Sequence, residues 1–172
     1  MKIAILATGG TFDKEYNEIN GALYFKKTHL QEMLSMGRCR LPVRIEVVMM
    51  KDSLEMTERD RRQILNACRG CEESRIVITH GTDTMVDTAR FREGKVPGKT
   101  IVLTGAMVPY TFGSSDGLFN LGSALSFAQV LPEGVFVAMN GRFFHPRQVR
   151  KDRRRGIFVR HRGKSGDAGG GL

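Results

Sequence analysis

Apolar runs and segments of helical periodicity alternate along most of this chain. Five runs are almost continuously apolar, as expected of buried parallel strands that are covered on both faces. They span residues 3–7, 43–50, 75–79, 100–104 and 134–139. The segments between them place apolar residues at helical spacing, and we expect helices over residues 28–37, 57–71, 83–93 and 116–130. Strands joined by such helices indicate βαβ units, so the sequence predicts an α/β fold, a three-layer parallel-sheet domain of the flavodoxin or Rossmann type.

Local signals mark the ends of two of these helices. Thr28 is expected to be the N-cap of the first, because a hydroxyl accepts hydrogen bonds from the free N–H groups of a first turn. Thr57 and Asp60 have the spacing of a capping box at the start of the second.

Two regions depart from the alternation. Residues 8–24 are polar, with Gly and Asn, and we expect a long loop of the kind that often carries function. Beyond Asn140 the pattern fails, apart from a short apolar run at residues 157–159 that indicates a short strand. The sequence therefore predicts one domain over residues 1–152 and a basic, Gly-rich tail over residues 153–172 that is largely disordered.

The length of 172 residues suits one domain, and 41% hydrophobic and 26% charged residues are ordinary globular values. The net charge of +9 is concentrated near the end of the chain, since residues 142–172 carry ten Lys and Arg but two Asp and Glu. A basic face over the whole domain would have indicated nucleic acid. A basic arm does so only weakly, so a nucleic-acid partner is not expected.

The cellular compartment is predicted from three features that the sequence lacks. The apolar run at residues 3–7 is too short for a secretory signal, and no segment approaches the length of a membrane span. Three cysteines, an odd number, do not suggest a disulfide framework. Cys68 and Cys71 are spaced C-x-x-C, but no second pair completes a zinc site. We expect a cytoplasmic protein with no membrane partner and no metal.

The first candidate for chemistry is Thr8-Gly9-Gly10-Thr11, directly after the first predicted strand. Ligands of open α/β sheets bind at the carboxyl ends of strands, and two glycines let the backbone approach a ligand closely. Either threonine is a potential nucleophile once a base such as the Tyr16 phenol or a lysine takes its proton. The structural alternative is a tight turn whose threonines bond to the backbone.

Thr82 and Asp83 form a second candidate, after the third predicted strand. Both residue types are favoured at helix N-caps, so on their own they are better explained as a cap. Lys151 lies in a basic run and, on its own, is better explained as a solvated charge. It gains importance only if the fold returns it to the edge of the sheet.

At these residues the chain resembles a known family, the bacterial-type L-asparaginases, which are threonine amidohydrolases. The matching segments are ILATGGTFDKEY, ITHGTDTM, VLTGAMVPY followed by SSDGLFNL, and FVAMNGRFF through RQVRK. They occur in the order of the family's N-terminal domain, across about residues 3–152. Several motifs in order are far more specific than any single one.

The resemblance implies catalytic roles. Thr11 resembles the primary nucleophile, and Tyr16 lies on the flexible loop beside its hydroxyl. Thr82, Asp83 and Lys151 resemble the Thr-Lys-Asp triad that is the second group of the family's site. With Thr11 taken as the nucleophile, Thr8 is expected to be structural.

The resemblance also implies substrate contacts. Thr82 and Asp83 belong to the binding site as well, with Asp83 binding the α-amino group of the substrate. Ser53 matches the serine that holds the α-carboxylate, and Ala106 the position whose backbone carbonyl orients the side-chain amide. No metal or organic cofactor is implied.

Two departures from the family pattern affect the pocket. Members usually have a second, C-terminal domain of about equal size, which supplies an acidic residue across a subunit interface, and this chain stops before it. The family's usual Gln after the serine is Leu54 here. We therefore expect a homo-oligomer that completes its pocket by association, or a more open site, and weaker substrate binding.

The function expected from residues and resemblance is hydrolysis of L-asparagine to L-aspartate and ammonia by a threonine nucleophile. A glutaminase or mixed amidase is an alternative, because one extra methylene changes binding only modestly. Two others are the amidase component of a tRNA-dependent amidotransferase and a non-catalytic remnant. The presence of Thr11, Tyr16, Thr82, Asp83 and Lys151 argues against a remnant.

Overall fold

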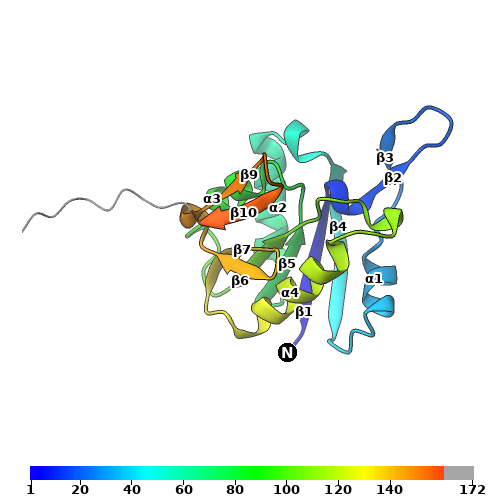
Figure 1. The fold of residues 1–172 in the computed structure, drawn as a ribbon. Helices are drawn as coiled ribbons and strands as arrows, with labels where there is room; N and C mark the ends of the chain where they lie inside the picture. Colours follow the sequence, from blue (N-terminus) through cyan, green and yellow to red (C-terminus); the bar gives the residue numbers. More distant parts are fainter. Residues whose placement is uncertain (161–172) are drawn as a thin grey trace, which may run out of the picture.

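A six-stranded sheet forms the centre of the structure, a computed structural model that describes residues 1–160 (Figure 1). In spatial order its strands are β4 (Val43–Lys51), β1 (Ile3–Gly9), β5 (Arg75–Thr79), β6 (Thr100–Thr104), β7 (Gly134–Met139) and β8 (Arg142–Phe144). The first five are parallel, and β8 pairs with β7 in the antiparallel direction. All five predicted strands are present.

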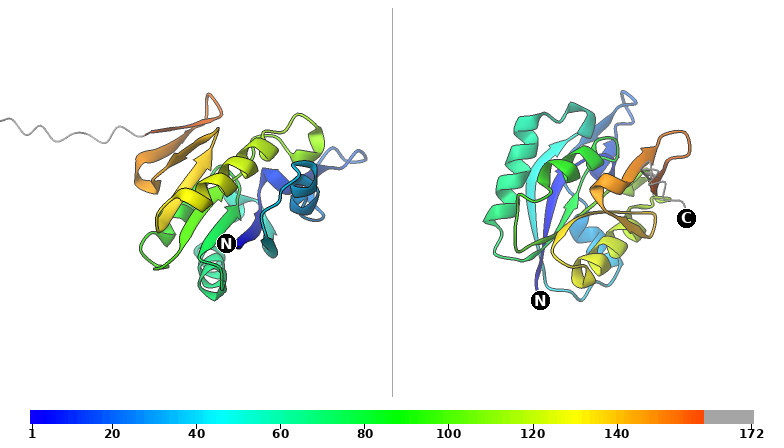
Figure 2. Two further views of the ribbon diagram at one scale, coloured as in Figure 1. Left: turned by 90° about the horizontal axis from the view of Figure 1, so that it is seen from below. Right: turned by 90° about the vertical axis from the view of Figure 1, so that its left-hand side faces the viewer.

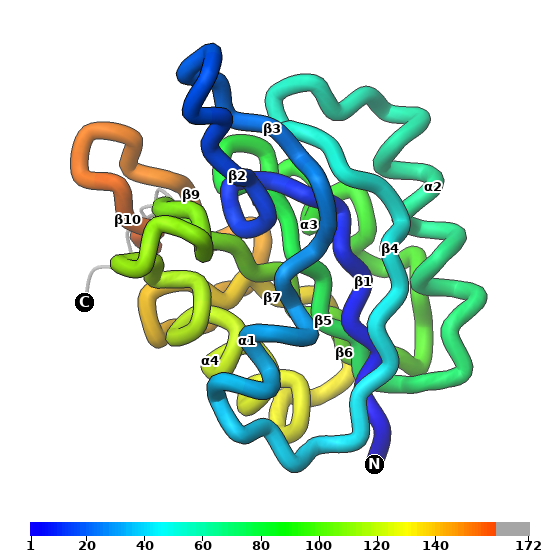
Figure 3. The backbone as a smooth tube through the Cα atoms, turned by 90° about the vertical axis from the view of Figure 1, so that its right-hand side faces the viewer, coloured from blue at the N-terminus to red at the C-terminus, as the bar shows by residue number. Residues whose placement is uncertain are grey.

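Helices cover both faces of the sheet, as the views in Figures 2 and 3 show. The helices are α1 (Leu30–Met36), α2 (Glu58–Gly70), α3 (Met85–Arg92) and α4 (Gly117–Val130). Alternate residues of β1 divide between two cores: Ile3 and Ile5 pack with α1 and α4, whereas Ala4 and Leu6 pack with α2 and α3. This arrangement confirms the three-layer α/β prediction and explains why β1 is apolar at every position.

The start of α2 is as predicted, and the start of α1 is not. The Thr57 hydroxyl accepts from the N–H of Asp60, whose carboxylate accepts from the N–H of Thr57, so the capping box is confirmed. In α1 the N-cap is His29, which makes no capping bond through its side chain. Thr28 lies one residue before the N-cap, so the prediction was wrong by one position, although its hydroxyl accepts from the N–H of Leu30 at 3.4 Å while it donates to Asp13 at 3.1 Å.

Residues 8–24, predicted as a loop, contain regular structure. A 3-10 turn, η1 (Thr11–Asp13), leads into an antiparallel hairpin of β2 (Lys14–Tyr16) and β3 (Leu23–Phe25). Asn17 closes the hairpin turn by accepting from the N–H groups of Ile19 and Asn20. The hairpin extends away from the body of the molecule in Figure 1.

A second hairpin follows β8. It consists of β9 (Val149–Asp152) and β10 (Ile157–Arg160), and Phe158 of β10 is 2% exposed. The short strand predicted at residues 157–159 is thus confirmed as β10. A boundary at residue 152 would fall inside this hairpin, and residues 161–172, which make up most of the predicted tail, lie outside the described part of the chain.

None of the helices within residues 1–160 combines the length and the apolar character needed to cross a membrane.

Candidate active site

The predicted site residues come from loops at one edge of the sheet. Ala7 of β1 is level with Thr79 of β5, which is level with Thr104 of β6, so the loops after these strands begin side by side. They carry Thr11, then Thr82 with Asp83, then Ala106. The loop after β4 carries Ser53 next to them. This is the edge where ligands of open α/β sheets bind.

Three glycines allow these loops to pack closely against one another. A β-carbon on Gly10 would lie 2.3 Å from the Gly81 nitrogen, and one on Gly81 would lie 2.4 Å from Ser53 Oγ. One on Gly105 would lie 2.3 Å from the carbonyl oxygen of His80. Contacts this short exclude any side chain, so glycine is required at each position. Gly10 also has a φ of 79°, which favours glycine independently.

Lys151 lies against Thr82 and Asp83. Its Nζ donates to Thr82 Oγ1 at 2.7 Å and to Asp83 Oδ1 at 2.9 Å. The lysine side chain is 11% exposed, whereas a solvated charge would be open to water. It is brought there by β9, whose Lys151 is paired with the buried Phe158 of β10. The fold therefore returns Lys151 to the edge of the sheet, and its interpretation as a solvated charge was wrong.

Ser53 is buried beside the loop of Thr82. It opens a 3-10 turn, η2 (Ser53–Glu55), which Asp52 caps by accepting from the N–H of Leu54. The carbonyl of Ser53 accepts from the Thr84 hydroxyl at 2.8 Å. Leu54, at the position of the family's usual Gln, points into solvent with 66% exposure. It therefore offers no polar contact to a ligand.

The two threonines after β1 differ in their surroundings. The Thr8 side chain is fully buried and its hydroxyl donates to the Thr79 carbonyl at 2.7 Å, so it is structural, as predicted. Thr11 is half-buried, and its hydroxyl forms no hydrogen bond within residues 1–160. Of the two, Thr11 is the one whose hydroxyl is free to react.

Tyr16 is not bonded to the rest of the site. It lies on β2 with 52% exposure, and its ring packs edge-on against Phe112, with the centroids 6.4 Å apart. Its hydroxyl faces Gly21 of the same hairpin. Within the described residues it forms no hydrogen bond to Thr11. Lys14 pairs with Asp52, so the base of the hairpin is held beside the Ser53 loop.

Ala106 is positioned by polar residues that sequence reasoning missed. The Asp116 carboxylate accepts from the N–H groups of Met107 and Val108, at 2.9 and 3.1 Å. Asn120, fully buried in α4, donates to the Gly105 carbonyl at 2.9 Å and to Asp116 at 2.8 Å. An asparagine on the inward face of an apolar helix was the available signal, because buried amides are normally hydrogen-bonded.

The same network continues to the second hairpin. Asn120 Oδ1 accepts from the N–H of Asn140, and Asn140 Oδ1 accepts from the N–H of Phe158 in β10. The hairpin that carries Lys151 and the loop that carries Ala106 are therefore joined by a continuous series of hydrogen bonds.

His80, at the start of the loop that carries Thr82, is held by hydrogen bonds to that loop and to β6. Its main-chain N–H donates to the Thr104 carbonyl, and its Nδ1 lies 2.8 Å from the Gly81 carbonyl oxygen. A carbonyl cannot donate, so Nδ1 carries the proton and Nε2 does not. Burial lowers the pKa of His80 to about 4, which keeps the imidazole neutral at pH 7. Nε2 is buried without a partner among the described residues.

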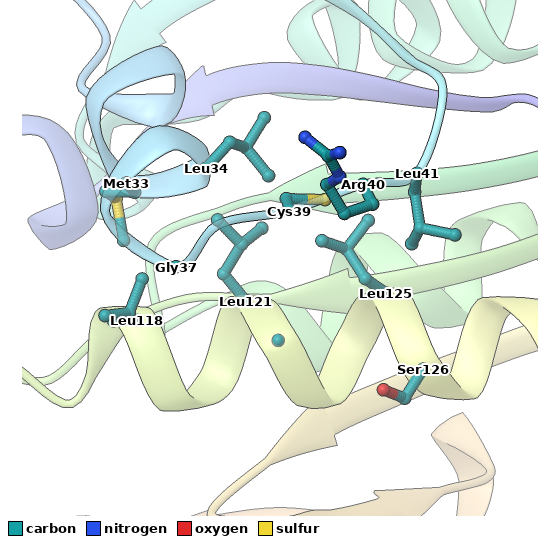
Figure 4. A pocket seen from close by; sticks show the side chains of 11 residues that line it. Met33, Leu34, Gly37, Cys39, Arg40, Leu41, Leu118, Leu121, Leu125 and Ser126 are labelled. Atoms are coloured by element: carbon teal, nitrogen blue, oxygen red, sulfur yellow. The ribbon is translucent and has the colours of Figure 1, made fainter.

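An apolar hollow of about 350 Å³ lies elsewhere, between α1 and α4 (Figure 4). Met33, Leu34, Leu121 and Leu125 contribute to its lining, and none of the predicted site residues does. Within residues 1–160, no three His, Cys, Asp or Glu side chains are grouped so that they could hold a metal ion.

Comparison with known proteins gives one consistent relationship. The family model described as Asparaginase, N-terminal matches residues 2–157. The chain is 34% identical over 162 residues to a glutaminase-asparaginase of Pseudomonas fluorescens biotype A, covering 87% of this chain and 45% of that protein. It is 35% identical over 153 residues to one component of the glutamyl-tRNA(Gln) amidotransferase of Methanococcus vannielii, covering 81% of this chain and 34% of that component.

A solved structure is also similar. The thermostable L-asparaginase from Thermococcus kodakarensis aligns with a TM-score of 0.77 and 31% identity, over 88% of this chain and 48% of that one. The chain thus spans less than half the length of each of these three proteins. It belongs to the asparaginase family, and the part of the family that it matches is the N-terminal domain.

Proposed function

We propose that this chain hydrolyses the side-chain amide of L-asparagine to L-aspartate and ammonia. The observation that carries the proposal is the largely buried Lys151 ammonium group, which bonds to both Thr82 and Asp83 at the ligand-binding edge of the sheet. A hydroxyl, a lysine and a carboxylate within hydrogen-bond reach form the arrangement needed to move a proton to or from a reacting group.

In this mechanism Thr11 Oγ1 attacks the amide carbon and loses its proton. The proton passes to the leaving nitrogen, which departs as ammonia, and water then hydrolyses the resulting ester to release aspartate. Lys151, held by Asp83, exchanges protons through the Thr82 hydroxyl. The N–H of Gly10 already donates to the Lys51 carbonyl at 3.0 Å, so Thr11 and Thr82 are the better N–H donors for the oxyanion.

Substrate binding uses the neighbouring loops. Asp83 binds the α-amino group, Ser53 the α-carboxylate, and the Ala106 carbonyl orients the amide. The close packing of Gly10, Gly81 and Ser53 supports this assignment, because it brings loops from three strands within reach of one small amino acid.

Lys151→Met tests the proposal most directly. Loss of a general acid–base group is expected to lower kcat for ammonia release from L-asparagine by about 10²–10⁴-fold. The matched control is Lys99→Met, which removes another partly buried ammonium group that bonds to the Cys71 and Glu73 carbonyls, away from the site. Lys99→Met is expected to keep kcat per folded molecule. If Lys151→Met keeps most of its kcat, the proposed mechanism fails.

The same assay separates the substrate alternatives. Ammonia release is measured with L-asparagine and L-glutamine in parallel, and we expect a higher kcat/KM for asparagine. A higher value for glutamine would favour the glutaminase or amidotransferase alternative, which the relatives named above keep open.

We also propose that the chain forms a homo-oligomer through the outer face of α4. This helix has no charged residue, and it exposes Phe119 (63%) and Val130 (77%). A chain with a net charge of +9 repels its own copies least across an uncharged face. Phe119→Asp is expected to shift sedimentation to the monomer, whereas Ile19→Asp, at a 98% exposed apolar residue of the β2–β3 turn, is not. A monomeric wild-type chain would refute this proposal.

A further inference from the structure

The turn after β9 places a second cation at Asp83. Arg153 Nε lies 4.0 Å from Asp83 Oδ1, the same oxygen that accepts from Lys151 Nζ at 2.9 Å. The Arg153 side chain is 70% exposed and that of Asp83 is 33% exposed, so the pair lies where the site meets solvent.

The backbone of the turn is held in place. Asp152 Oδ1 accepts from the N–H groups of Arg154 and Arg155, at 3.1 and 3.3 Å. On the other side of the turn, the N–H of Phe158 donates to Asn140. These bonds fix the backbone of the turn, so that Arg153 begins from a position from which its guanidinium reaches Asp83.

This pairing alters what Asp83 can bind. One carboxylate faces two cations, so its surroundings carry a net positive charge before any substrate arrives. An α-ammonium group entering there gains the attraction of Asp83 but meets repulsion from Lys151 and Arg153. A substrate without that positive charge meets no such repulsion.

We propose that Arg153 is a specificity-determining residue that shifts this site away from free α-amino acids. Relative to L-asparagine, the site then gains affinity for monoamides of dicarboxylic acids with no positive charge on the α-carbon, such as desamino or N-acylated forms of asparagine. The inference rests on the proposed function, because it takes Asp83 as the contact for the α-amino group.

Binding measurements test this without relying on turnover. The dissociation constants of L-aspartate and succinate, which differ only in the α-amino group, are measured by calorimetry on the full chain. Arg153→Gln is expected to strengthen the binding of L-aspartate relative to succinate by about fivefold, which is the size expected from removing one nearby, partly solvated charge. High salt should reduce the shift. Arg154→Gln, the same charge change one residue on, is the matched control and should leave the ratio unchanged.

Kinetics supply the second readout. In Arg153→Gln the KM for L-asparagine should fall with kcat kept, and kcat/KM for the anion succinamate should not rise. Three results would overturn the inference. They are an equal ratio of the two dissociation constants in the wild type and Arg153→Gln, an equal shift of that ratio in Arg153→Gln and Arg154→Gln, and a chain that binds neither L-aspartate nor succinate. A shifted binding ratio without ammonia release from any substrate would instead overturn the proposed function alone.

Discussion

Thr11→Ala is expected to abolish ammonia release while the chain stays folded. Without the hydroxyl no acyl intermediate forms, and we expect kcat to fall by about four orders of magnitude or more. The fold should be kept, because Thr11 is half-buried and its hydroxyl bonds to nothing within residues 1–160. Initial rates of ammonia release and thermal unfolding of the same preparations measure the two effects.

Two substitutions control for this result. Thr11→Ser restores a hydroxyl and should recover measurable turnover. Thr8→Val removes the buried bond to the Thr79 carbonyl, and should lower the free energy of unfolding by about 1–3 kcal/mol while turnover per folded molecule is kept. The assignment of the nucleophile would be wrong if Thr11→Ala kept most of its activity.

Gly10→Ala is expected to be the most damaging small change to stability. Gly10 has a φ of 79° and a ψ of −177°, a region almost restricted to glycine, and this strain alone costs about 1–3 kcal/mol for other residues. The added methyl would also lie 2.3 Å from the Gly81 nitrogen, so the loops after β1 and β5 must separate. We expect a loss of about 3 kcal/mol or more in the free energy of unfolding, together with loss of turnover.

Urea unfolding measures the effect, with Gly70→Ala as the matched control. Gly70 ends α2, and a β-carbon there would meet nothing within 4 Å. This change should leave the urea midpoint unchanged or raise it slightly, since alanine favours helix by up to about 1 kcal/mol over glycine. Similar midpoints for Gly10→Ala and the wild type would show that the close packing of the loops is not required.

The elements of the sheet were predictable because their signals are local. An apolar run that ends in Gly or Thr marks a buried strand and its ligand-binding end, and this was enough to place Thr11 and Thr82 at one edge. Lys151 was different. Its neighbours in sequence are charged, so the local signal indicated solvent, and only the resemblance to a family indicated the site. Its burial depends on the pairing of β9 with β10.

The missed features depend on partners far away in sequence. Asn120 bonds to Gly105 and Asn140, and no local pattern identifies such partners. The β2–β3 hairpin was missed because each strand has only three residues, and its polar turn resembles a loop. Sequence reasoning found the residues that carry functional groups, but not the hydrogen bonds that hold them in position.

The distance in sequence between Thr11 and Lys151 has a consequence for how the site is assembled. A sheet of β1, β4, β5, β6 and β7 contains the loops of Thr11, Ser53 and Thr82 but lacks the lysine. Contacts between distant parts of a chain form late, because the loop between them must first be closed. In refolding experiments, recovery of turnover should therefore report the docking of the β9–β10 hairpin, and should lag behind the spectroscopic signal of the central sheet.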